Sequence, residues 1–261
     1  MYMNAFVKNL LLKIKPIAKI RNSRLLQRFK KISEKDAKIS AIKLRDSWKE
    51  PSIHSMQDEH INIELSEYTN GASVAVFDVL TSLLSKNIER INEKSILEIG
   101  CSSGYYSEVL KIKEIHSEFT GCDYSRAFID YAKVKYPDGK WDVEDATDLS
   151  YQDLSYDVVI SGCCILHIYD FEKAIAEAAR VSKEYVLFHR TPVIQKNRTA
   201  YYLKQAYGIE MLEIHFNENS LIELMGKYNL EMVDSKTTDN FPFWDGDDVF
   251  SFKSFLMKKR V

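Results

Sequence analysis

The sequence has few cysteines, and their spacing excludes the common metal-binding patterns. Its 261 residues contain four, Cys101, Cys122, Cys163 and Cys164, all in apolar or glycine-rich surroundings. None forms a C-x-x-C pair or lies at zinc-ligand spacing from a histidine. We therefore expect reduced, buried thiols, no metal site, and a cytoplasmic protein.

Long apolar runs are also missing. No segment approaches the ~20 consecutive apolar residues that a membrane-spanning helix needs. The first twenty residues are interrupted by Lys8, Lys13 and Lys15 and contain no cleavage site of small residues. These features argue against a membrane-spanning helix and a signal peptide.

The net charge of −2 conceals an uneven distribution. Residues 1–49 contain 14 Lys and Arg against 3 Asp and Glu, a balance of +11, whereas the remainder contains 22 basic and 35 acidic residues. Apolar residues recur at near-helical spacing in the basic segment, which predicts a helical arm for an anionic membrane surface or a partner. One proline and scattered charges weaken the apolar stripe, so the interpretation that we favour is an arm that packs on the acidic body of its own chain or of a homodimer partner. The acidic body argues against a nucleic-acid partner.

Strand and helix patterns alternate from residue 95 to residue 190. Apolar runs that predict strands cover 95–100, 117–123, 139–145, 156–163 and 184–190, with helical patterns between them. A helix and two alternating strands follow, at 219–229, 230–237 and 248–259. This order predicts an α/β fold with a mostly parallel sheet. Residues 1–47 are expected to be helical, 48–62 to form a loop, and 193–217 to be an irregular insertion above the sheet.

The stretch "LEIGCSSG" joins the first predicted strand to a helix. Gly100 and Gly104 would let the backbone approach a ligand closely. The spacing differs from G-x-G-x-x-G, which a dinucleotide-binding turn requires. Because the carboxylate of Glu98 precedes the turn, a pyrophosphate would be repelled and a cationic ligand favoured. A nicotinamide oxidoreductase is therefore disfavoured.

Four stretches together resemble the motifs of class I S-adenosylmethionine (SAM)-dependent methyltransferases, in the family's order. They are "LEIGCSSG", "GCDYS", "VEDATDL" and "YDVVISGCCILHI", within a resemblance that covers roughly residues 90–260. The resemblance implies a Rossmann-like, seven-stranded, mostly parallel sheet with an antiparallel last strand. It also implies that Asp123 binds both ribose hydroxyls, that Asp145 and the backbone of Ala146 bind adenine, and that SAM is the cofactor. The implied cofactor-binding residues are Glu98, Gly100, Cys101, Ser102, Gly104, Asp123, Tyr124, Asp145, Ala146, Ser161 and Gly162.

The resemblance divides the chain into two parts. Residues 1–60 would form the basic helical arm and a lid, in which Trp48 and Gln57 close over SAM. Residues 61–261 would form the methyltransferase domain, with an acceptor lid at about 193–217.

The acceptor side is predicted from polar residues at strand ends. His167 and His189 follow the fourth and fifth predicted strands, where either could act as a general base. Packing or a hydrogen bond to loop backbone is the alternative for His167, and an ion pair with the acidic body is the alternative for Arg190. The candidate catalytic residues are His189, His167 and Arg190, and the candidate substrate-binding residues are Arg190, Arg198, Tyr201 and Tyr207.

The function that follows is O-methylation of a small, anionic acceptor. The chain resembles stand-alone methyltransferases of bacterial capsule and surface-glycan clusters, some of which methylate sugar hydroxyls. Others methylate a phosphate on the way to O-methyl phosphoramidate, with glutamine phosphate as acceptor. Arg190 and Arg198 favour a phosphate acceptor of this kind. A sugar-hydroxyl or other small-molecule methyltransferase is the alternative. A non-catalytic SAM-binding protein that docks a membrane or partner through its arm is the alternative of another class.

Overall fold

A computed structural model describes the chain except residues 1–28, 51, 197, 239–242, 246–247 and 261. The strands are β1 (Phe29–Ile32), β2 (Ser95–Ile99), β3 (Glu118–Asp123), β4 (Lys140–Val143), β5 (Tyr156–Gly162), β6 (Ser182–Ile194), β7 (Ala200–Ala206), β8 (Ile209–Asn217), β9 (Leu230–Thr237), β10 (Phe243–Asp245) and β11 (Asp248–Lys259). The α-helices are α2 (Glu34–Leu44), α3 (Ser52–Thr69), α4 (Ala75–Asn87), α5 (Tyr106–Ile112), α6 (Arg126–Lys135), α7 (Phe171–Val181) and α8 (Glu218–Lys227). Short 3-10 turns are η1 (Arg45–Lys49), η2 (Ile91–Glu93) and η3 (Ile165–His167).

Seven strands form the core sheet, in the order β4-β3-β2-β5-β6-β11-β9. Strand β11 is antiparallel to both β6 and β9, and the pairs β4–β3, β3–β2, β2–β5 and β5–β6 are parallel. The predicted fold class, including the antiparallel last strand, is confirmed. The strand order reverses between β2 and β5, and ligands of open α/β sheets bind in the crevice at such a switch point.

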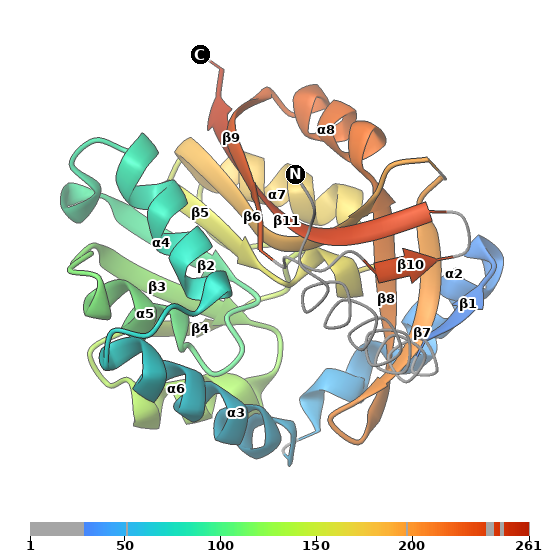
Figure 1. The fold of residues 1–261 in the computed structure, drawn as a ribbon, viewed down its shortest axis with the longest axis horizontal. Helices are drawn as coiled ribbons and strands as arrows, with labels where there is room; N and C mark the ends of the chain where they lie inside the picture. The colour runs from blue at the N-terminus through green and yellow to red at the C-terminus, as the bar shows by residue number, and fades with distance from the viewer. Residues whose placement is uncertain (1–28, 51, 197, 239–242, 246–247, 261) are drawn as a thin grey trace, which may run out of the picture.

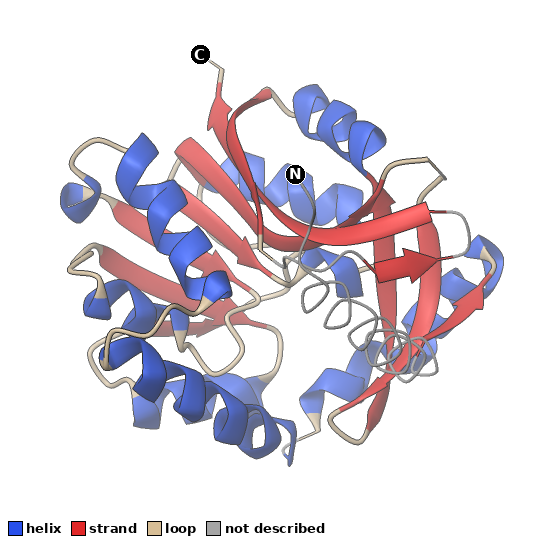
Figure 2. Ribbon diagram, in the orientation of Figure 1, coloured by secondary structure: helices blue, strands red, loops and turns tan. Residues whose placement is uncertain are grey.

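Helices cover both faces of this sheet (Figure 2). The central strands are apolar on both sides, as buried parallel strands must be. Helices α7 and α8 pack with Val159, Val186 and Phe188 on one face. Helices α4 and α5 pack with Ile160 and Leu187 on the other. Helices therefore cover both faces of the sheet, and a ligand-binding site is expected at the carboxyl ends of its strands.

Residues 193–217 are not irregular, contrary to the sequence prediction. Strands β7 and β8 form an antiparallel hairpin, and β8 continues the sheet by pairing with the end of β6 at Val193 and Ile194. The two-residue turn, Tyr207–Gly208, has φ of +52° and +73°, which is the conformation of a tight hairpin turn. Figure 1 shows this hairpin standing beside the carboxyl ends of β5 and β6.

Two further predictions for the N-terminal part are wrong. Residues 29–32 form β1, which pairs antiparallel with β7, instead of continuing a helix. Most of the segment expected to be a loop at 48–62 belongs to helix α3. The rest of the predicted basic arm, residues 1–28, lies outside the described residues.

The indole of Trp141, in β4, lies against three glycines behind the β2–α5 turn. A Cβ atom built on Gly104, Gly121 or Gly139 would lie 2.4–2.5 Å from this ring. The ring therefore occupies space that only glycine leaves open.

Gly121→Ala should destabilise the protein by about 1–3 kcal/mol, because the buried Trp141 ring would have to move. Gly226→Ala is the matched control, since nothing lies within 4 Å of a Cβ there and alanine is favoured in a helix by up to about 1 kcal/mol. Urea denaturation of both variants measures the effect. Equal stability of the two variants would show that the ring does not require glycine at residue 121.

Candidate active site

The β2–α5 turn brings backbone and small side chains to the switch point. Gly100 and Gly104 have φ of +71° and +82°, a region that L side chains rarely adopt. A Cβ on Gly100 would also lie 2.4 Å from Sγ of Cys164. The amides of Gly100 and Cys101 donate to the carbonyl of Cys122 at 2.8 and 3.0 Å, which ties the turn to the end of β3.

Asp123 lies at the carboxyl end of β3 with its side chain buried. Its two carboxylate oxygens accept the amides of Ser102 at 3.1 Å and Ser125 at 2.9 Å. Burial raises the pKa of Asp123 to about 6, against the lowering effect of those two amides. Each oxygen retains acceptor capacity, so the carboxylate is fixed in position and can still accept hydroxyl donors.

Buried polar atoms without hydrogen-bond partners among the described residues gather beside Glu98. They are Glu98 Oε2, Tyr106 Oη and His189 Nε2. Ser161 Oγ also lacks a partner, but strand pairing places Ser161 beside Ile99, on the other face of the sheet from Glu98. Strand pairing sets Glu98 beside Ile160, and Gly162 beside His189, while the rings of Tyr106 and His189 are 5.4 Å apart. Because buried polar groups are normally paired, this cluster indicates a polar ligand.

Glu98 is an unusual carboxyl group because no described cation contacts it. Burial, followed by the neighbouring Asp123, raises its pKa well above the ordinary value. The two carboxyl groups therefore disfavour each other's ionisation. A cationic group between or beside them would relieve this cost.

The far end of the crevice is built around Asp145. Its Oδ1 accepts from the amide and hydroxyl of Thr147, and its Oδ2 is 2.7 Å from Arg45. Burial raises the pKa of Asp145, but the hydrogen bonds from Thr147 and Arg45 outweigh burial and leave it lowered. Arg45 also accepts the Tyr124 hydroxyl through its carbonyl, at 2.5 Å. The sequence analysis missed Arg45.

Turn η1 and the first turns of α3 contact residues at the carboxyl edge of the sheet. The ring of Trp48 lies 4.8 Å from His167 and 6.3 Å from Tyr207. Gln57 accepts the hydroxyl of Ser102 at 2.7 Å. This segment therefore contacts both the β2–α5 turn and the β7–β8 hairpin.

The predicted catalytic residues differ in their surroundings. His167 Nδ1 is 2.7 Å from the carbonyl of Leu212, and burial lowers its pKa. His189 is fully buried, with Nδ1 2.8 Å from Ser254 Oγ. Burial and the nearby Arg190 lower its pKa to about 3, which makes its imidazole a weak base. The guanidinium of Arg190 is centred 5.1 Å from the Phe252 ring.

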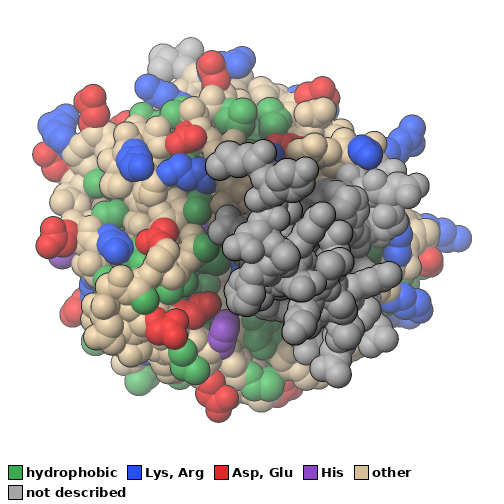
Figure 3. Space-filling model, in the orientation of Figure 1, with side chains coloured by type: hydrophobic (Ala, Val, Ile, Leu, Met, Phe, Trp, Pro, Cys, Tyr) green, Lys and Arg blue, Asp and Glu red, His purple; other side chains and the backbone are tan. Residues whose placement is uncertain are grey.

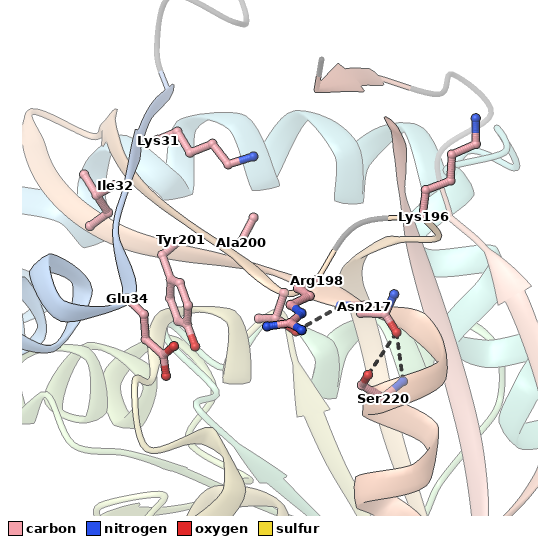
Figure 4. A pocket seen from close by; sticks show the side chains of 10 residues that line it. Lys31, Ile32, Glu34, Lys196, Arg198, Ala200, Tyr201, Asn217 and Ser220 are labelled. Atoms are coloured by element: carbon pink, nitrogen blue, oxygen red, sulfur yellow. Dashed lines mark hydrogen bonds between the residues drawn. The ribbon is translucent and has the colours of Figure 1, made fainter. Parts of the chain in front are cut away.

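The predicted substrate residues are not all brought together. Arg198 and Tyr201 line a pocket of about 700 Å³ with Lys31, Lys196 and the start of α8, whose Asn217 caps the helix (Figure 4). None of the predicted cofactor residues lines this pocket. Tyr207 lies at the hairpin turn instead, and Arg190 in β6.

The described surface carries charges of both signs. On the face in Figure 3, Lys and Arg side chains are interspersed with Asp and Glu. Among the described residues, no group of three His, Cys, Asp or Glu side chains could hold a metal ion. No helix in the described ranges is long and apolar enough to cross a membrane.

Residues 97–188, which run from β2 into β6, match a family model described as a methyltransferase domain. Residues 97–188 are thus similar to a methyltransferase domain, and the sheet order is that of the class I fold of SAM-dependent methyltransferases. SAM is the methyl donor of this class.

Individual relatives agree with that class. The demethylmenaquinone methyltransferase of Thermotoga maritima is 29% identical over 96 residues, which are 37% of this chain and 42% of that protein. The match thus spans less than half of the relative.

Solved structures show the same fold at low identity. A SAM-dependent methyltransferase from Clostridium acetobutylicum is similar with a TM-score of 0.56 at 13% identity, over 79% of this chain and all of that one. The 1,6-didemethyltoxoflavin-N1-methyltransferase of Burkholderia thailandensis, solved with S-adenosylhomocysteine, gives a TM-score of 0.52 at 15% identity, over 80% and 90% of the two chains.

Glu98→Gln should change how stability depends on pH. The pKa of Glu98 is about 4.5 in the unfolded chain and higher in the folded protein. Folding therefore favours its protonated form, and its contribution to stability is lost as pH rises from about 4.5 through the folded value. The glutamine variant does not lose stability in this way, so its free energy of unfolding should rise relative to that of the wild type as pH increases.

Urea denaturation of the ligand-free protein at several pH values measures this difference. A glutamine variant that is less stable than the wild type by the same amount at every pH would contradict the assignment of a buried, unpaired carboxyl group.

Proposed function

We propose that the protein is a SAM-dependent O-methyltransferase of a small, anionic acceptor. The observation that carries the proposal is the pair of buried carboxyl groups, Glu98 and Asp123, at the switch point of a class I fold. They suit a ligand that combines a diol with positive charge. SAM would supply a methyl group on a sulfonium, which is transferred without redox chemistry.

The residues present fit this cofactor. Asp123 would accept both ribose hydroxyls, an arrangement of charge-assisted hydrogen bonds. Asp145 and the amide of Ala146 would bind the adenine, with Arg45 either yielding or sharing the Asp145 carboxylate. Glu98 and Ser161, whose polar atoms lack described partners, would bind the amino-acid end beside Gly162. Gly100, Cys101, Ser102, Gly104 and Tyr124 would line the remaining surface.

The acceptor would be held by cationic and aromatic side chains. Arg190 lies one residue after His189 at the carboxyl edge and would bind an anionic group. Tyr207 would contribute from the hairpin, and Arg198 and Tyr201 from the pocket in Figure 4. His189 is a weak base, because burial and Arg190 lower its pKa to about 3, so an acceptor that must lose a proton would need another base.

Phosphate O-methylation in capsule biosynthesis, with a glutamine phosphate-type acceptor, is the version we favour. A sugar hydroxyl is the second candidate acceptor, and a base is then required. Four statements from the sequence remain predictions. They are a cytoplasmic location, a homodimer, contact of the basic arm with a membrane or partner, and the division of the chain at residue 60. Transfer of label from methyl-labelled SAM to phosphorylated glutamine or to sugar nucleotides tests the acceptor class.

Two substitutions should separate cofactor binding from acceptor binding. Asp123→Ala should weaken binding of S-adenosylhomocysteine from the micromolar range (~10⁻⁶ M, about −8 kcal/mol) by at least about tenfold, since two charge-assisted hydrogen bonds are lost. Arg190→Ala should abolish transfer and leave that affinity nearly unchanged. Isothermal titration and the labelled-methyl assay provide the two measurements.

Normal turnover in Arg190→Ala would refute the anionic acceptor. Wild-type protein that binds neither SAM nor its demethylated product, yet binds anionic vesicles, would instead favour a non-catalytic docking role.

A further inference from the structure

Three ionisable side chains lie together on the β7–β8 hairpin, two of them buried and the third, Lys204, partly exposed, and no role above uses them. Glu213 Oε2 is 2.6 Å from Lys204 Nζ, and Glu213 Oε1 is 3.1 Å from His215 Nε2. Glu213 and His215 are almost completely inaccessible to solvent. Such a cluster is costly to bury and is weak evidence for a stabilising role.

The cluster lies on one face of the hairpin because side chains alternate along a strand. Leu212, Ile214 and Phe216 pack into the core with α7 and α8. Glu213 and His215 therefore face the opposite side. There the His215 ring lies between Tyr202, at 4.5 Å, and Phe250, at 4.2 Å.

This face adjoins the predicted reaction centre. His167, which follows the β5 motif, is hydrogen-bonded to the carbonyl of Leu212, and its charge interacts with that of Glu213. In the other direction, Phe250 contacts Phe252, over which the Arg190 guanidinium lies. Figure 1 shows the hairpin facing the carboxyl ends of the parallel strands.

The protonation state of His215 follows from its partner. Burial raises the pKa of Glu213, but His215 and Lys204 outweigh burial and lower it to about 2. Glu213 is thus ionised and can only accept hydrogen bonds, so Nε2 of His215 carries the proton. In neutral imidazole the other nitrogen, Nδ1, is then a free acceptor, and it has no partner within the described ranges.

We propose that His215 is the general base that receives the proton of the methyl acceptor, and that Glu213 is the positioning residue that holds its ring. The inference rests on the proposed methyltransferase function. It narrows the acceptor to an oxygen that is still protonated when it binds, in an alcohol or a monoprotonated phosphate. The acceptor oxygen forms a bond to the methyl carbon, the methyl–sulfur bond breaks with its electron pair left on sulfur, and the proton moves to Nδ1.

The charges around His215 suit this transfer. Glu213 stabilises the imidazolium as it forms, while Lys204 neutralises Glu213 beforehand. Lys31 lies 5.8 Å from the Tyr202 ring, and His167 lies on the cofactor side.

His215→Gln tests the base directly. Glutamine can retain an amide donor to Glu213 but has no group in place of Nδ1. We expect turnover with the labelled acceptors to fall by about 100-fold or more, while affinity for S-adenosylhomocysteine changes by less than about twofold. The rise of wild-type turnover with pH, as imidazole loses its proton, should disappear.

Two further variants separate the roles. Glu213→Gln should shift that rise to lower pH, because the carboxylate no longer stabilises the imidazolium. His116→Gln is the matched control on an exposed histidine and should leave rates and profile unchanged. Equal turnover and equal pH profiles in His215→Gln and wild type would overturn the inference, and would indicate an acceptor that binds already ionised.

Nitrogen NMR of ¹⁵N-histidine-labelled wild type with bound S-adenosylhomocysteine decides the matter even if His215→Gln fails to fold. In the neutral ring of His215, the proton should lie on Nε2. A proton on Nδ1 would overturn this inference and leave the proposed function unaffected. Failure of the wild type to bind S-adenosylhomocysteine would contradict the proposed function instead.

Discussion

Glu98 and Asp123 end two neighbouring parallel strands, and the described part of the chain encloses both carboxyl groups without placing a cation against either. Backbone amides of Ser102 and Ser125 fix Asp123, while Glu98 is left with an unpartnered oxygen among the described residues. This cost exists because β2 and β3 pair in parallel and end at the same edge. The ligand that relieves it must bring positive charge and hydroxyl donors to that edge.

The rest of the fold arranges the two ends of such a ligand. Turn η1 contacts both ends of the site. Arg45 binds Asp145, and Trp48 lies beside Tyr207 of the hairpin. The hairpin in turn extends the sheet beyond β6 and brings a buried carboxylate and histidine toward the fourth motif.

The sequence predicts the core sheet well, for local reasons. Continuous apolar runs mark strands buried on both faces, and the glycine turn after "LEI" marks the crevice. The hairpin was missed because its turn is Tyr207–Gly208, which lacks the Asn-Gly or Asp-Gly signal. The alternation of apolar and polar residues was visible in "MLEIHF", where Glu213 and His215 are the polar positions.

Other parts of the site could not be predicted because they depend on distant partners. Arg45 binds Asp145 across a hundred residues of sequence, and no local pattern distinguishes it from the other basic residues of its segment. Helix α3 was taken for a loop because its residues are polar and follow Pro51. His189 looked suited to act as a base from its position at a strand end, whereas its burial beside Arg190 lowers its pKa to about 3.

A crystal structure of the protein with S-adenosylhomocysteine tests the central claim most directly. The account predicts the nucleoside in the crevice between the ends of β2 and β5, with both ribose hydroxyls on Asp123 and the amino-acid end beside Glu98 and Ser161. An empty crevice, or one that a dinucleotide fills instead, would contradict it.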